Sequence, residues 1–488
     1  MTRSHPIRLG GAFTLIALLL TPRAASAQRP FPSDSSLRAT LADLVAAGRA
    51  AGVVVGLLEE DGTRRVVAHG SPGAGGRPLD GESVFEIGSI TKTFTGTLLA
   101  DMASRGNVAL TDPIASLLPA EVRVPARNGK VITLLDLTTH RSGLPRLPTN
   151  FSPADPANPY ADYTEQQLYA FLSGFTLPRE PGAAALYSNV GLGLLGHGLA
   201  RRAGMSYEAL VTERILRPLG MEHSGITLTP WMREHLAHGH NAYGDRVPNW
   251  DITTLAGAGA LRSTADDMLR YAAAALTAGD TGVLVAVHDA LRARRAYGTG
   301  GDSIGFNWIV SAGNERTITW HNGGTAGYRT FLGLDRAAGQ AVVVLTNSGG
   351  NGLDDLGFHL LDPTIRLAPV PVGPAVATAY RRGGIEAALA RYRTLRAAEQ
   401  DAGRFGEGEL NGVGYWLLRS GRTEDAIVVF RLNVEMFPDA SNPHDSLGEA
   451  YLVRGDTGRA IVSYRRSVEL NPNNTNGIEV LRRLGVRQ

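Results

Sequence analysis

The pattern of apolar and polar positions predicts strands at two distant ends of the first 367 residues, with helices between them. Residues 53–58 form an apolar, β-branched run, and after the turn at Asp61 and Gly62 a second run, residues 65–69, returns. This arrangement is typical of a hairpin. Further strand patterns follow only much later, at 306–310, 317–320, 329–334 and 341–345. We therefore predict an α+β fold in which distant segments close one antiparallel sheet flanked by helices.

Helical periodicity dominates the region between these strands. One helical pattern covers residues 35–48, and a longer one starts at Ser89, with apolar side chains recurring on one face. Ser263, with Asp266 three residues later, forms a capping box that predicts a helix over residues 268–276.

A second, all-helical domain is predicted at the C-terminus. The Pro- and Gly-rich stretch 368–374 marks a linker, and from residue 375 to 488 the chain repeats itself after 34 residues. The paired positions are Gly414 and Gly448, Leu417 and Tyr451, Gly421 and Gly455, Ala426 and Ala460, Phe430 and Tyr464, and Pro438 and Pro472. Period and residue types resemble tetratricopeptide helix pairs, and a weaker first unit lies at 380–393. Such repeats bind peptides or pack on a neighbouring domain, and the sequence leaves both roles open.

The N-terminus has the pattern of a secretory signal. Arg3 and Arg8 precede an apolar run at residues 12–20, and Ala25-Ser26-Ala27 matches the small-residue cleavage pattern. The alternative, a membrane anchor, needs about twice that apolar length. We predict cleavage after residue 27 and a periplasmic or secreted location. The first folded domain of the mature chain is then expected over residues 28–367.

The amino-acid composition excludes several kinds of functional site. There is no cysteine, which excludes disulfides, thiolate nucleophiles and cysteine-based metal sites. The formal charge of +2 falls to −1 without the signal, which argues against nucleic-acid binding. Only two of the 48 basic residues are lysines, Lys92 and Lys130.

Ser89 and Lys92 are three residues apart at the start of the long helical pattern, a spacing that places both on one helix face. A serine hydroxyl needs a base to become a nucleophile. Lysine serves as that base when its pKa is lowered, whereas arginine keeps its proton. The Ser-x-x-Lys motif alone is weak evidence, because it also arises by chance.

Two further segments strengthen the evidence for a catalytic serine. Tyr187 and Asn189 place a phenol and a carboxamide on one loop before an apolar helix. His321-Asn322-Gly323-Gly324 ends a predicted strand with a Gly-rich edge, against which an extended substrate can lie. Each residue also has a purely structural explanation, as a helix cap, a core tyrosine or a turn, but their joint occurrence favours a catalytic site.

The order and spacing of these motifs resemble the serine β-lactamase and D-alanyl-D-alanine peptidase superfamily, in particular its class C-like branch. The resemblance covers most of residues 35–362. It also includes Phe85–Gly88, Leu134–Pro145, Pro218–Met221, Ala260–Thr264 and Val344–Asn347.

This resemblance implies a role for each site residue. Ser89 would be the acylated nucleophile, Lys92 its base, and Tyr187 the group that protonates the leaving group and activates water. Asn189 would hold the substrate amide, and His321, Asn322 and Gly323 would also bind substrate. The backbone N–H groups of Ser89 and Gly324 would form the oxyanion hole. No cofactor or metal is implied.

Two departures bear on the substrate. Class C β-lactamases usually carry Lys-Thr-Gly in the third motif, whereas this chain has His321-Asn322-Gly323, similar to peptidase and esterase members. An arginine expected shortly after the last strand is absent from residues 347–351. Both weaken the case for efficient β-lactam hydrolysis, and the sequence does not choose among β-lactam, D-amino-acid peptide and ester.

Three other patterns are given structural explanations. Residues 301–305 match Gly-x-Ser-x-Gly, but no buried strand precedes them, so we predict a turn. His235, His238 and His240 are metal ligands by type only, and Lys130 follows a hairpin turn and should be solvated.

The predicted function is therefore a serine hydrolase that acts through an acyl-enzyme on a small amide or ester substrate. The alternative is a non-catalytic, penicillin-binding-like scaffold whose repeats bind a protein or peptide partner. Binding of nucleic acid and spanning of a membrane by the mature chain are not expected.

Overall fold

The computed structural model describes residues 30–313, 316–350, 352–398 and 404–486. The signal peptide predicted over residues 1–27 lies outside the described residues. In the part that is described, no helix is both long and apolar enough to cross a bilayer.

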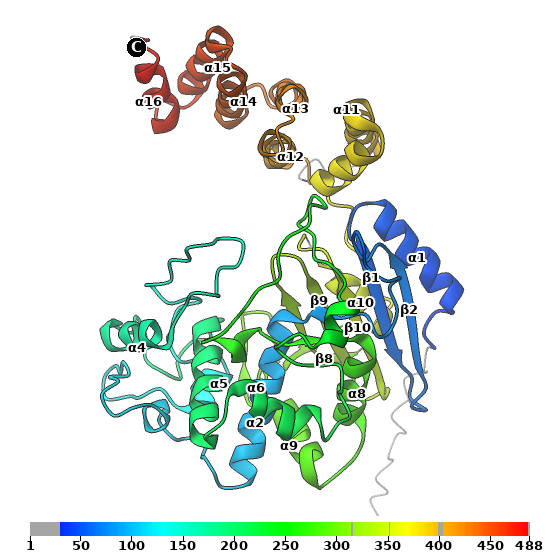
Figure 1. The fold of residues 1–488 in the computed structure, drawn as a ribbon, viewed down its shortest axis with the longest axis vertical. Helices are drawn as coiled ribbons and strands as arrows, with labels where there is room; N and C mark the ends of the chain where they lie inside the picture. Colours follow the sequence, from blue (N-terminus) through cyan, green and yellow to red (C-terminus); the bar gives the residue numbers. More distant parts are fainter. Residues whose placement is uncertain (1–29, 314–315, 351, 399–403, 487–488) are drawn as a thin grey trace, which may run out of the picture. The chain divides into compact units, whose positions relative to one another are not determined.

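One eight-stranded antiparallel sheet forms the centre of the first domain (Figure 1). In sheet order its strands are β2 (Arg64–Gly70), β1 (Gly52–Leu58), β10 (Gln340–Thr346), β9 (Arg329–Asp335), β8 (Thr317–Gly324), β7 (Ile309–Ala312), β6 (Ser303–Ile304) and β5 (Arg295–Ala296). The predicted closure by distant segments is confirmed, because Val53 in β1 lies opposite Thr346 in β10. The strand predicted over 306–310 begins later, at Ile309, and Asn307 before it has a positive φ of 62°.

Helices cover both faces of this sheet, which explains why β1 and β10 are buried at every position. Val53, Val55 and Leu57 of β1 face α1 (Asp34–Ala46) and α10 (Asp354–Leu361), and Val54 and Leu58 belong to the main core. Alternate side chains of a strand point to opposite faces. The main core also contains α2 (Thr91–Ser104), α5 (Asn189–Ala203), α8 (Ala265–Leu276) and α9 (Gly282–Leu291).

Shorter elements complete the domain. They are α3 (Leu134–Thr138), α4 (Glu165–Gly174), α6 (Tyr207–Val211), α7 (Pro230–Glu234), the helical turns η1 (Gly88–Ile90), η2 (Ile114–Leu117), η3 (Thr212–Leu216) and η4 (Ala256–Ala258), and the two-stranded pair β3 (Phe85–Glu86) and β4 (Arg262–Ser263). The N-cap of α8 lies one residue beyond the predicted capping box of Ser263 and Asp266. Thr264, not Ser263, caps α8, and its hydroxyl accepts the backbone N–H of Asp267 at 3.1 Å.

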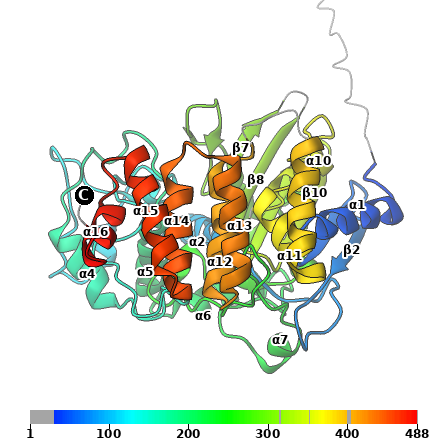
Figure 2. The same cartoon turned by 90° about the horizontal axis from the view of Figure 1, so that it is seen from above.

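The C-terminal region is helical throughout its described residues, as predicted. It contains α11 (Val372–Ala398), α12 (Glu407–Arg419), α13 (Thr423–Met436), α14 (Ser441–Arg454), α15 (Thr457–Leu470) and α16 (Thr475–Arg483), and Figure 2 shows them following one another in sequence order. Helix α11 starts inside the segment predicted as a linker and is interrupted at Gly383 and Gly384.

The helix bounds repeat after 34 residues, since α13 shifted by 34 coincides with α15 and the first residue of α12 falls on that of α14. The contacts repeat too. A Cβ at Gly414 would lie 2.4 Å from the ring of Phe430, and a Cβ at Gly448 would lie 2.9 Å from the ring of Tyr464. Glycine at these positions therefore lets each helix pair approach closely enough for the aromatic ring to fill the contact.

Candidate active site

Ser89 lies in the turn η1, immediately before α2. Gly88 directly before it has a φ of +51°, and a Cβ there would lie 2.6 Å from the backbone nitrogen of Gly324. Only glycine fits both this left-handed conformation and this close approach. The turn that carries Ser89 is thereby in direct contact with the end of β8.

Lys92 projects from the first turn of α2 and is fully buried. Its Nζ lies 2.8 Å from Ser89 Oγ and donates to the carbonyl of Ala258 at 2.5 Å. Burial and, secondarily, the positive charge of Arg146 lower the pKa of Lys92 well below its ordinary value. The free amine is therefore favoured, and its lone pair can accept the Ser89 proton.

Tyr187 reaches the same hydroxyl from the segment before α5. Its Oη donates to Ser89 Oγ at 2.7 Å, and the ring lies beneath Lys92, with Nζ 4.9 Å from the ring centroid. Burial raises the pKa of Tyr187, an effect only partly offset by the hydrogen bond to Ser89 and by the charge of Arg146. The resting side chain is therefore a phenol, which can donate a proton.

Two neutral histidines flank these groups. Burial, together with the nearby Lys92 amine, lowers the pKa of His321 to about 3. Its Nδ1 lies 2.6 Å from the carbonyl oxygen of Asn322, so this nitrogen carries the proton. The ring of His140 lies 4.6 Å from that of Tyr187, and its Nδ1 accepts the backbone N–H of Ser188 at 3.2 Å.

Asn189 is the first residue of α5, and the hydroxyl of Ser188 caps that helix. The Asn189 amide nitrogen donates to Tyr160 Oη at 3.3 Å, whereas its buried Oδ1 has no protein partner. A buried amide oxygen without a partner is costly. It is available to a substrate N–H.

Gly323 and Gly324 form the edge that the sequence predicted. A Cβ at Gly323 would lie only 2.0 Å from the carbonyl oxygen of Ile87, an oxygen that also accepts the hydroxyl of Thr330 at 2.9 Å. The missing side chain at Gly323 thus lets β8 touch the segment before Ser89. This contact brings the backbone of Gly324 beside η1.

The structure does not bring the side chain of Asn322 to Ser89. Its Nδ2 donates to Asp354 Oδ2 at 2.5 Å, and Asp354 belongs to α10 on the opposite face of the sheet from His321. The reason is strand alternation, which points residues 321 and 323 to one face and residue 322 to the other.

Sequence reasoning missed three contributors to the site. His140 lies within the Leu134–Pro145 motif and was not predicted to be a site residue, although its φ of +56° marks a constrained loop. Arg146, five residues beyond Arg141, lies over the Tyr187 ring at 5.2 Å. The Ala258 carbonyl, which binds Lys92, has no signal in the sequence because its side chain takes no part.

The histidines, Ser303 and Lys130, for which structural explanations were given above, have ordinary structural partners. His235 stacks on Trp231 at 3.6 Å, and His240 Nδ1 lies 3.1 Å from the Asn347 carbonyl. The described ranges contain no group of three or more His, Asp or Glu side chains able to hold a metal. Ser303 lies in β6 between two antiparallel neighbours. Lys130 is exposed and also pairs with Glu180 at 2.7 Å.

The chain is similar to known proteins in sequence and in fold. The D-alanyl-D-alanine-carboxypeptidase/endopeptidase AmpH of Escherichia coli (strain K12) is 31% identical over 309 residues, which cover 59% of this chain and 78% of that protein. A Beta-lactamase of the same strain is 28% identical over 258 residues, 53% of this chain and 65% of the relative. A solved Beta-lactamase/D-alanine Carboxypeptidase from Yersinia pestis, complexed with citrate, has the same fold, with a TM-score of 0.58 at 24% identity over 68% of this chain and all of that one.

The family model described as Beta-lactamase matches residues 37–366, more than half of the chain. The match spans every residue of the site, from Ser89 to Gly324. The chain therefore belongs to the Beta-lactamase family, within the superfamily of serine β-lactamases and D-alanyl-D-alanine carboxypeptidases, and is a serine hydrolase.

Proposed function

We propose that the chain hydrolyses amide or ester bonds through an acyl-enzyme formed on Ser89. The observation that carries the proposal is that one hydroxyl is contacted by two groups of complementary function, the Lys92 amine at 2.8 Å and the Tyr187 phenol at 2.7 Å. A nucleophile with a base and an acid within hydrogen-bond reach has the arrangement that acyl transfer requires.

In the acylation step, Lys92 Nζ takes the proton of Ser89 as Oγ forms its bond to the substrate carbonyl carbon. The carbonyl electrons move onto its oxygen, which the backbone N–H groups of Ser89 and Gly324 are proposed to stabilise. Removing one such donor typically costs a factor of about 10² to 10³ in kcat.

Collapse of this intermediate breaks the bond to the leaving group. The leaving group takes the proton of the Tyr187 phenol, and the Lys92 ammonium restores that proton, so the hydrogen first held by Ser89 ends on the leaving group. In deacylation, water adds to the acyl carbon and gives a proton to Tyr187 Oη while the phenol passes its own proton to the Lys92 amine. The bond between the acyl carbon and Ser89 Oγ then breaks, and the Lys92 ammonium returns a proton to Oγ.

For the substrate we propose a D-amino-acid peptide or a short ester, with β-lactams as poorer substrates. The carboxypeptidase and endopeptidase name of the AmpH relative supports the peptide. Neutral His321, in place of the lysine common in β-lactamases, supports the same preference. The unpartnered Oδ1 of Asn189 is proposed to accept the N–H of the acyl chain, and the edge at Gly323 to receive its backbone.

The proposal is tested by labelling and turnover. A fluorophosphonate or a fluorescent penicillin should label the chain once, at Ser89, and Ser89→Ala should abolish the label. Nitrocefin, D-alanyl peptides and short-chain esters would then be compared for turnover. Absence of any adduct on folded protein would reject the acyl-enzyme.

The alternative of a non-catalytic scaffold is not favoured. Burial of an amine without an anionic partner destabilises the fold, and Lys92 is fully buried beside Ser89. A catalytic role accounts for this cost, whereas a non-catalytic scaffold does not.

We also propose that the C-terminal helices are tetratricopeptide repeats and that the chain carries a signal peptide and acts in the periplasm or outside the cell. The 34-residue spacing of the helix bounds supports the repeat assignment. The proposal includes a peptide or protein partner for the repeats. A pull-down with the full chain, compared with one that uses a variant lacking residues 375–488, would test for such a partner.

A further inference from the structure

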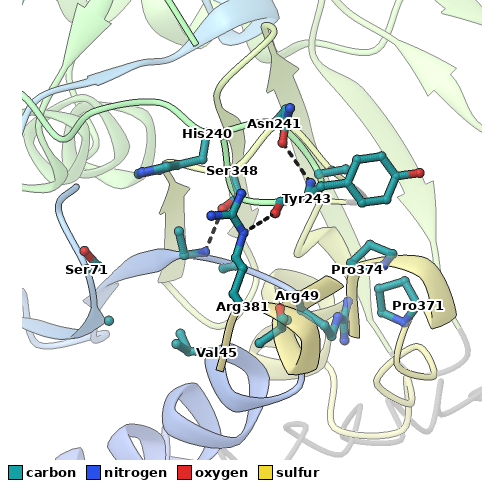
Figure 3. A pocket seen from close by; sticks show the side chains of 18 of the residues that line it. Val45, Arg49, Ser71, His240, Asn241, Tyr243, Ser348, Pro371, Pro374 and Arg381 are labelled. Carbon is teal, nitrogen blue, oxygen red and sulfur yellow. Dashed lines mark hydrogen bonds between the residues drawn. The ribbon is translucent and has the colours of Figure 1, made fainter. Parts of the chain in front are cut away.

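A hairpin over residues 239–247 connects the helical region with the segments that form the active site. The Val247 N–H closes this hairpin by donating to the Gly239 carbonyl at 2.9 Å. Its tip lines a cavity of about 360 Å³ together with residues 48–51, which precede β1, and with residues of α11 (Figure 3). The tip of the hairpin therefore lies where the sheet domain meets the helical region.

Side chains of the helical region hold the tip of the hairpin. The ring of Tyr243 stacks on that of Trp416 in α12, with 5.7 Å between the ring centroids. Asp245 accepts the Trp416 indole N–H at 2.7 Å and also pairs with Arg381 of α11. Arg381 Nε donates to the Tyr243 carbonyl at 2.8 Å, a contact drawn in Figure 3. Tyr243 and Asp245 are therefore each fixed by two residues of the helical region.

The approach between the tip and α12 is close enough to require a glycine. A Cβ at Gly412 would lie 2.2 Å from the hydroxyl oxygen of Tyr243, whereas ordinary contact for a Cβ begins at 3.4 Å. A side chain at position 412 would therefore displace the tip of the hairpin from the helix. One helical turn earlier, a Cβ at Gly408 would meet no atom within 4 Å.

The base of the hairpin contacts the turn that follows β8. The backbones of Gly239 and Gly327 touch there, since a Cβ at Gly327 would lie 2.7 Å from the Cα of Gly239. Tyr328, at the end of the same turn, donates its hydroxyl to the Ala237 carbonyl at 2.7 Å. This turn begins directly after Gly324, whose N–H is proposed to stabilise the oxyanion.

The residues just beyond the hairpin bind the segment before Ser89. Asn249 Nδ2 and the Trp250 backbone N–H each donate to Glu86 Oε1 at 2.8 Å. Glu86 is buried in β3, three residues before Ser89. Asn249 Nδ2 also donates to Tyr328 Oη at 3.0 Å. One side-chain amide thus connects the segment before the nucleophile with the turn after β8.

We infer that Tyr243 and Asp245 are positioning residues, through which the helical region fixes the spacing between η1 and the end of β8. The inference rests on the proposed function, because this spacing separates the two N–H groups of the proposed oxyanion hole. A displacement of about 1 Å between reacting groups lowers rates by as much as roughly 10²-fold. Acylation and deacylation both form an oxyanion, so a displaced hairpin slows both steps and lowers kcat with little change in KM. The helical region is then a part of the catalytic unit, whatever else it binds.

The first test places a wedge in the helical region. Gly412→Ala pushes against the Tyr243 hydroxyl, and alanine favours the helix more than glycine does. The matched control is Gly408→Ala in the same helix. Hydrolysis of a short-chain ester is measured in the full chain, per active site titrated to completion with fluorophosphonate. We expect Gly412→Ala to lower kcat per titrated site roughly tenfold with less than a threefold change in KM, and Gly408→Ala to match wild type.

The second test removes the contacts from the side of the hairpin. Tyr243→Ala and Asp245→Ala should each lower kcat per titrated site roughly tenfold, whereas Tyr243→Phe keeps the stacked ring and should keep kcat. Combined with Trp416→Phe, which removes the indole N–H, Asp245→Ala should show less than the product of the single effects. The matched control Tyr415→Ala removes a half-buried ring of α12 that packs on Phe430. It should lower the temperature of thermal unfolding and leave kcat per titrated site unchanged.

The outcomes separate positioning from a purely structural role. A structural role would lower the labelled fraction in Gly412→Ala and Tyr243→Ala but leave kcat per titrated site unchanged. That result, equal losses of kcat in the two controls, or multiplicative effects in the double variant would overturn the inference, while labelled wild type keeps the hydrolase. If wild type takes no label and turns over no ester, the proposed function fails and this inference with it.

Discussion

Replacing Gly323 by alanine would place a methyl group where β8 touches the segment before Ser89. The added Cβ would lie 2.0 Å from the Ile87 carbonyl oxygen and 2.4 Å from Thr330 Oγ1. Ordinary contact for such a pair begins at 3.4 Å, so the strand and the turn must separate by about 1.4 Å. Because a displacement of about 1 Å between reacting groups costs up to roughly 10²-fold in rate, we expect kcat/KM to fall by about two orders of magnitude.

The assay is ester hydrolysis per fluorophosphonate-labelled site, with thermal unfolding measured on the same sample. The matched control is Gly174→Ala at the end of α4, where an added Cβ meets no atom within 4 Å. The control should behave as wild type in both measurements. If Gly323→Ala kept wild-type kcat/KM, the contact between β8 and Ile87 would not set the catalytic geometry, and the reasoning would be refuted.

Three further changes have defined outcomes. Lys92→Arg keeps the charge but cannot release a proton, so acylation of Ser89 measured with fluorophosphonate should fall to background; an unchanged rate would contradict the role of the base. Arg146→Gln removes a cation that disfavours protonated Lys92, so the pKa of Lys92 should rise and the acidic limb of the kcat/KM profile should move to higher pH; a shift to lower pH would contradict the sign. Asp355→Ala leaves the buried Arg49 guanidinium without its carboxylate at 2.7 Å and should lower the free energy of unfolding by about 3–5 kcal/mol in urea denaturation.

Much of the fold was predictable because its signals are local. The two apolar runs that became β1 and β10 are buried on both faces, so their unbroken hydrophobicity identified them and their distance implied a closed sheet. The 34-residue repeat fixed the helix pairs for a related reason, since each glycine is paired with an aromatic ring sixteen residues later. The grouping of Ser89, Lys92 and Tyr187 followed from motif order and not from periodicity.

The missed features depend on backbone groups or on contacts between distant segments. Asn322 was predicted to bind substrate, yet the two-residue alternation of β8 that points His321 to the site sends Asn322 to Asp354. This placement follows from the alternation of the strand, because Trp320 and Asn322 share a face. The roles of Ala258 and of Tyr243 were not predictable, since one acts through its carbonyl and the other through a partner more than 160 residues away.

The rarity of lysine in this chain is consistent with the physics of its one buried lysine. Lys92 is fully buried, and among the described residues no carboxylate lies within 4 Å of its amine, so a protonated side chain would carry an uncompensated charge. Burial therefore favours release of the proton and lowers the pKa of Lys92 well below its ordinary value. An arginine in the same place could not release its proton, and its charge would remain in the core. The environment that favours Lys92 as a base thus also excludes arginine, which is the basic residue at almost every other basic position of the chain. The lowered pKa and the exclusion of arginine have the same cause, which is that no described carboxylate lies beside the Lys92 amine.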